Sequence, residues 1–74
     1  MKNTITGLTE TLIETLDVQH FIQGVREFDK VTQKQCLLKA RRELRKPLIM
    51  SLHGPELTRK AMTEIRTALD GTAN

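Results

Sequence analysis

Hydrophobic residues recur every three or four positions along most of the chain, which is the spacing that places side chains on one face of an α-helix. In the first segment, residues 4–16, this spacing joins Ile5, Leu8, Leu12 and Leu16, and acidic side chains fall on the opposite face. The pattern predicts a first helix over about residues 4–16, with boundaries good to about 2–4 residues.

A second apolar stripe follows at once and predicts a helix over about residues 18–29. Asp17 is suited to cap its start. The junction at Leu16 and Asp17 is short, so the pattern allows either a sharp corner or one continuous helix. Gly24 lies off the stripe, where the missing side chain would let another helix approach closely. The stripe consists of Val18, Phe21, Ile22, Val25 and Phe28.

The third segment begins with a sequence that matches a capping box, in which Thr32 is followed three residues later by Gln35. We therefore expect a helix over about residues 33–53, with Leu37, Ala40 and Leu44 facing inward. Pro47 lacks an N–H group and disfavours helical geometry in the residue before it, so this helix should bend there.

The clearest interruption is His53-Gly54-Pro55. Gly54 suits the end of one helix, Pro55 suits the first position of the next, and His53 is placed to stabilise a helix C-terminus. The last helix is expected over about residues 55–70. Its inward face is formed by Leu57, Ala61, Ile65, Ala68 and Leu69.

The fold expected from these patterns is all-α: a compact bundle of three to four short helices, the third kinked at Pro47, in a single domain spanning residues 1–74. Sustained alternation typical of strands is missing from the sequence, so no sheet is expected. A chain of this length buries only about 60% of the surface that its unfolded form exposes. Self-association, most simply a homodimer, is therefore expected to add stability.

The net charge of +3 is distributed unevenly. Residues 1–29 hold two cations against five acids, and residues 47–74 hold three of each. Residues 30–46 hold seven cations and one acid, Glu43. This concentration of positive charge is the strongest functional signal in the sequence, because it indicates an anionic partner.

Six of these cations fan over roughly 160° of the third helix, taking about 100° per residue. Their spread along a helix lets them meet several phosphates at once, and the arginines can also form bidentate contacts. We therefore expect a small regulatory binding protein that engages nucleic acid, most simply duplex DNA. The expected binding residues are Lys34, Lys39, Arg41, Arg42, Arg45 and Lys46.

A second interpretation assigns the same ridge to an acidic protein partner. Four apolar residues directly follow the basic segment, and together they would form a docking surface for a helical adaptor or inhibitor, for example one encoded by a phage or another mobile element. A third interpretation pairs the basic helix with the acidic first helix of a second copy. The apolar candidates are Leu48, Ile49, Met50 and Leu52.

Enzymatic chemistry is not indicated. Cys36 and His20 would have to serve as nucleophile and base, but they lie in different predicted helices with no activating neighbour. The histidines, the cysteine and the acids do not have the spacing of a metal site, and the glycines do not form a phosphate-binding loop. We expect no catalytic residue, no metal and no cofactor.

The sequence predicts no membrane attachment. A bilayer span needs about 18 or more apolar residues in succession, and polar residues interrupt every apolar run here. The single cysteine, Cys36, excludes an internal disulfide and favours a reducing compartment. The expected location is therefore cytoplasmic.

Overall fold

The computed structural model describes residues 5–72, and within this range five α-helices follow one another with short connections. The all-α class is confirmed, whereas the expected number of three to four helices is too small. The helices are α1 (Ile5–Thr15), α2 (Val18–Val25), α3 (Lys30–Leu44), α4 (Pro47–His53) and α5 (Pro55–Thr72).

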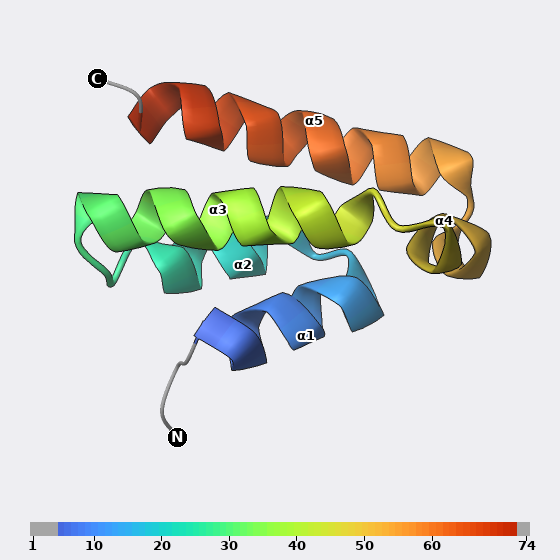
Figure 1. Ribbon diagram of the computed structural model, residues 1–74, viewed down its shortest axis with the longest axis horizontal. Coiled ribbons are helices and arrows are strands. Elements are labelled where there is room, and N and C mark those ends of the chain that lie inside the picture. Colours follow the sequence, from blue (N-terminus) through green and yellow to red (C-terminus); the bar gives the residue numbers. More distant parts are fainter. Residues whose placement is uncertain (1–4, 73–74) are drawn as a thin grey trace.

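The helices form a flat body with extents of 32 × 30 × 17 Å. In Figure 1, α3 and α5 run antiparallel side by side, α1 lies on the far side of α3 from α5, and α2 lies behind α3. The short α4 turns the chain at one end, between α3 and α5. This arrangement leaves α3 central, yet with part of its surface open to solvent.

All five helices contribute to one hydrophobic core. The largest fully buried side chains include Phe21, Leu12, Leu44 and Ile65, which come from four different helices. Burial of this apolar surface is the main force that holds the flat layer together. The core residues are Leu8, Leu12, Val18, Phe21, Val25, Cys36, Leu37, Ala40, Leu44, Ile49, Ala61 and Ile65.

The junction between α1 and α2 is a sharp corner. Leu16 adopts a left-handed backbone conformation with φ of 55°, and Asp17 then caps α2 by accepting a hydrogen bond from the His20 N–H at 3.2 Å. The predicted cap is thus confirmed. The predicted close approach at Gly24 is also confirmed, because the Leu8 side chain of α1 lies against that position.

The start of α3 differs from the prediction. The helix begins at Lys30, with Asp29 in extended conformation at the N-cap position, so Thr32 lies inside the first turn and does not cap. The Gln33 side chain instead donates to the Phe28 carbonyl at 2.7 Å, in the turn before the helix. The capping-box match at Thr32 therefore does not mark the start of the helix, because Asp29, three residues earlier, occupies the N-cap position.

Pro47 does not kink a long helix, as the sequence suggested, but separates two helices. Lys46 is extended, with φ of −69° and ψ of 135°, and Pro47 then occupies the first position of α4. The physical reason is that Pro47 has no N–H to continue the α3 ladder and crowds the residue before it out of the helical region.

The next connection follows the prediction, because Gly54, with φ of 91°, ends α4 and Pro55 opens α5. Glycine suits this position because a positive φ is strained for residues with a side chain. None of the helices within residues 5–72 is both long enough and apolar enough to cross a lipid bilayer.

Candidate nucleic-acid interface

The helix α3 has one buried face and one exposed, cationic face. Cys36, Leu37, Ala40 and Leu44 are buried against the rest of the fold. The cations predicted to bind are all exposed, and they project from the opposite side of the helix or from its end. These are Lys34, Lys39, Arg41, Arg42, Arg45 and Lys46.

Most of this positive charge has no paired carboxylate among residues 5–72. Lys46 pairs with Glu43, one turn earlier, at an N···O distance of 2.5 Å. In the part of the chain that the structure describes, the other five cations form no ion pair with a carboxylate. These five charges are therefore available to an external anion.

Leu38 divides the cationic face into two flanks. Its side chain is 41% exposed, and it borders two shallow surface hollows. One hollow is lined by Leu38, Arg41, Arg42 and Arg45, and the other includes Lys39, Arg42 and Lys46. Leu38 and Arg42 line both hollows, so they lie along the middle of the cationic face. We call these two residues the crest.

The structure adds two arginines that the sequence interpretation missed. Arg59 and Arg66 of α5 lie along a groove with Arg41 and Arg45 of α3. Their seven-residue separation, close to two helical turns, places them on one face of α5 and was a signal available in the sequence. The positive surface thus extends over two helices.

The predicted apolar cluster does not form one surface. Ile49 is only 7% exposed and belongs to the core, and Met50 is half-buried. Leu48 and Leu52, in contrast, are 77% and 68% exposed. The division arises because successive residues of a helix point about 100° apart, so α4 directs Ile49 inward while Leu48 and Leu52, four residues apart, remain outside.

The thiol and histidine considered for nucleophilic chemistry are not arranged for it. Cys36 is fully buried, and burial raises the pKa of its thiol, which favours the unreactive neutral form. His20 is exposed on α2. Within residues 5–72, no three histidine, cysteine or acidic side chains lie close enough to hold a metal ion.

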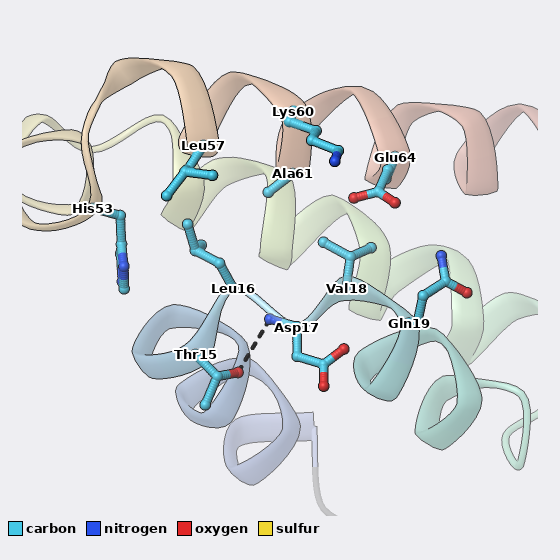
Figure 2. A pocket seen from close by; sticks show the side chains of 10 residues that line it. All are labelled: Thr15, Leu16, Asp17, Val18, Gln19, His53, Leu57, Lys60, Ala61 and Glu64. Carbon is cyan, nitrogen blue, oxygen red and sulfur yellow. Dashed lines mark hydrogen bonds between the residues drawn. The ribbon is translucent and has the colours of Figure 1, made fainter.

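Figure 2 shows a further pocket of about 320 Å³, between the α1–α2 corner and α5. The Leu16 and Leu57 side chains point toward each other across it, with Lys60 and Glu64 on the α5 wall. The Asp17 N–H donates to the Thr15 hydroxyl at 3.1 Å at its edge. Both signs of charge line this pocket, whereas the hollows on the α3–α5 surface are lined mainly by cations, with Glu43 as their one acid among residues 5–72.

Within residues 5–72, the cationic surface of α3 and α5 is therefore the arrangement whose charge is best suited to phosphate or carboxylate groups. Comparison of the chain with protein-family models, with curated proteins and with solved structures finds no match.

Proposed function

We propose that the chain is a non-enzymatic, regulatory binding protein that engages duplex DNA through the exposed face of α3. The observation that carries the proposal is the set of five exposed α3 cations without a carboxylate partner among residues 5–72. Neutralising phosphates releases condensed counterions, which is the principal source of sequence-independent affinity for DNA.

The dimensions of α3 suit the major groove. The helix contains 15 residues, which corresponds to a length of about 22 Å, and a helix with its side chains is about 10–12 Å wide. The major groove is about 12 Å wide. In this placement the two flanks of α3 would face the two phosphate strands, and the crest would face the base edges.

The crest carries groups that can discriminate between bases. Arg42 can donate two hydrogen bonds to guanine, and the exposed Leu38 can contact a thymine methyl group. Single-stranded nucleic acid fits less well, because base stacking requires exposed aromatic rings. Phe21 is buried and Phe28 is half-buried.

The test is the salt dependence of binding to a short fluorescent duplex, measured by anisotropy between about 50 and 200 mM salt. Each phosphate contact contributes about −0.9 to the slope of log K against log salt, so four or five contacts predict a slope near −4. Replacing Lys39 and Arg42 by Gln should flatten the slope by about two, on the same scale.

A matched control removes two exposed cations from outside this surface, by replacing Arg26 and Lys60 with Gln. The net charge falls equally, so the control should keep a slope close to that of the wild type. Failure of the wild-type protein to bind duplex at low salt would reject the proposed function.

A second candidate is docking on an acidic protein, favoured by the exposure of Leu48 and Leu52. The two side chains are separated by one helical turn and could insert into an apolar cleft beside the basic ridge. Replacing both by Ser should leave duplex binding unchanged and remove a protein partner. Affinity capture from lysate, with and without nuclease, separates the two candidates.

A further inference from the structure

A groove of about 430 Å³ runs between α3 and α5, and arginines line both of its walls. We call it the arginine groove. Arg41 and Arg45 belong to α3, and Arg59 and Arg66 belong to α5. The two helices lie side by side and antiparallel (Figure 1), and the four arginines line one hollow between them.

The lining of the arginine groove contains no carboxylate. Its two remaining residues are Met62 and Thr63, which are apolar and neutral polar respectively. Among residues 5–72, none of the four arginines forms an ion pair. Like charges gathered in this way repel each other and destabilise the compact state unless an anion joins them.

The spacing of the arginines suits a chain of anions better than a single one. Arg41 and Arg45 are separated by about 6 Å along α3, and Arg59 and Arg66 by about 10 Å along α5, at 1.5 Å per residue. One strand of a duplex carries one phosphate per 3.4 Å of axis. The backbone path between phosphates is longer than this axial rise, so a groove of this length can hold about two consecutive phosphates of one strand.

Arginine is also the side chain best matched to this ligand. Its planar guanidinium forms two parallel hydrogen bonds to phosphate oxygens, which gives directional as well as electrostatic binding. The partly exposed Leu38 and the groove lie on adjoining surfaces of α3, since Arg41 and Arg45 border both. A strand in the groove would thus lie directly beside the crest of α3.

We propose that the arginine groove holds consecutive backbone phosphates of one strand of the duplex whose major groove receives α3. The inference rests on the proposed function and extends it, because it makes α5 a second contact element and fixes the orientation of the protein on DNA. Phosphate contacts of this kind set register, while the crest reads bases.

The test replaces Arg59 and Arg66 by Gln, which leaves every α3 side chain in place. The slope of log K against log salt for a short duplex should flatten by about two, at 0.9 per lost phosphate contact. Replacing the same two arginines by Lys should restore the slope but not the full affinity, because Lys keeps the charge and loses the bidentate geometry. Circular dichroism confirms that each variant folds.

The variant with Gln at positions 26 and 60 again serves as the charge-matched control. The inference is overturned if the wild type binds duplex but the Arg59→Gln, Arg66→Gln variant keeps the wild-type slope, or if the control flattens the slope equally. In the first case duplex binding by α3 would still stand, whereas a control that flattens the slope equally would also contradict binding through the α3 face. A wild-type protein that binds no duplex would overturn the proposed function together with this inference.

Discussion

The Nε2 atom of His53, at the end of α4, lies 2.5 Å from the backbone carbonyl oxygen of Ile13, 40 residues earlier in α1. The last four carbonyl groups of a helix have no partner within it. Leu12 finds one in the N–H of Leu16, at 2.7 Å. His53 supplies one for Ile13, so α4 caps the end of α1 through a ring N–H that donates to the carbonyl.

Replacing His53 by Ala should lower the free energy of unfolding by about 1 kcal/mol, because the Ile13 carbonyl loses its hydrogen bond in a half-buried position. Urea denaturation measures the change. His20→Ala is the matched control, since His20 is exposed and its side chain is not used by the α2 cap. Equal stability of the two variants would contradict the capping role.

Position 16 should prefer glycine to alanine. The left-handed conformation of Leu16 costs a residue with a Cβ atom about 1–2 kcal/mol, whereas glycine adopts it freely. Leu16→Gly should therefore be more stable than Leu16→Ala, although both remove the same half-buried side chain. The thermal midpoints of the two variants provide the measurement.

The control for this comparison is Thr11, which lies exposed inside α1. There Thr11→Ala should exceed Thr11→Gly in stability by about 1 kcal/mol, as expected for a helix interior. The same order at both positions would show that the backbone of Leu16 is not strained.

Gly24 and Leu8 should be energetically coupled. A Cβ atom at position 24 would lie 2.6 Å from Leu8 Cδ2, so Gly24→Ala forces the buried Leu8 side chain to move. Overpacking of this kind costs about 1–3 kcal/mol, which exceeds the gain of about 1 kcal/mol in helix propensity. We expect Gly24→Ala to destabilise the wild type.

In a Leu8→Val background, the shorter side chain leaves room, and Gly24→Ala should become neutral or stabilising. A double-mutant cycle in urea measures this coupling. Additive effects within about 0.5 kcal/mol would indicate that α1 and α2 do not approach closely at Gly24.

The carboxyl group of Asp29 should contribute to stability in a pH-dependent manner. Its pKa is lowered, chiefly by a hydrogen bond from the Thr32 hydroxyl and further by backbone N–H groups at the start of α3. The folded state thus favours the ionised form. The contribution is complete above the ordinary pKa of about 3.9 and is lost as the pH falls through the lower folded value.

Asp29→Asn cannot ionise, so it should be less stable than the wild type at pH 6, and the difference should shrink when the pH is lowered to a value below the ordinary Asp range. Urea midpoints at the two pH values provide the comparison. A constant difference across this interval would show that Asp29 acts through packing or backbone geometry instead of its charge.

Local features of the fold were predictable from sequence. Asp17 capping α2 and the restart at Gly54 and Pro55 depend on a few neighbouring residues, so the sequence contains all that determines them. The break between α3 and α4 at Pro47 was not predictable from sequence. A bent helix and two separate helices are both compatible with a proline that lacks an N–H. The choice between them depends on where α4 must go to bury Ile49.

The contribution of α5 to the basic surface was hidden for a different reason. Its segment holds equal numbers of acids and cations, so its composition gives no signal. Packing divides these charged residues between two flanks of α5. Arg59 and Arg66 line the arginine groove beside α3, while Lys60 and Glu64 line the pocket on the other flank. Only the placement of α5 against α3 reveals the four arginines as one group.

The order of the helices also places two acidic side chains far from the arginine groove within residues 5–72. The exposed Glu10 and Glu14 belong to α1, which forms the edge opposite α5 in Figure 1. Among residues 5–72, these two acids therefore lie on the opposite edge of the layer from Arg59 and Arg66 of α5. If the proposed function holds, this uneven distribution of charge would steer the protein toward DNA with its arginines foremost, because the field of a polyanion attracts cations and repels carboxylates.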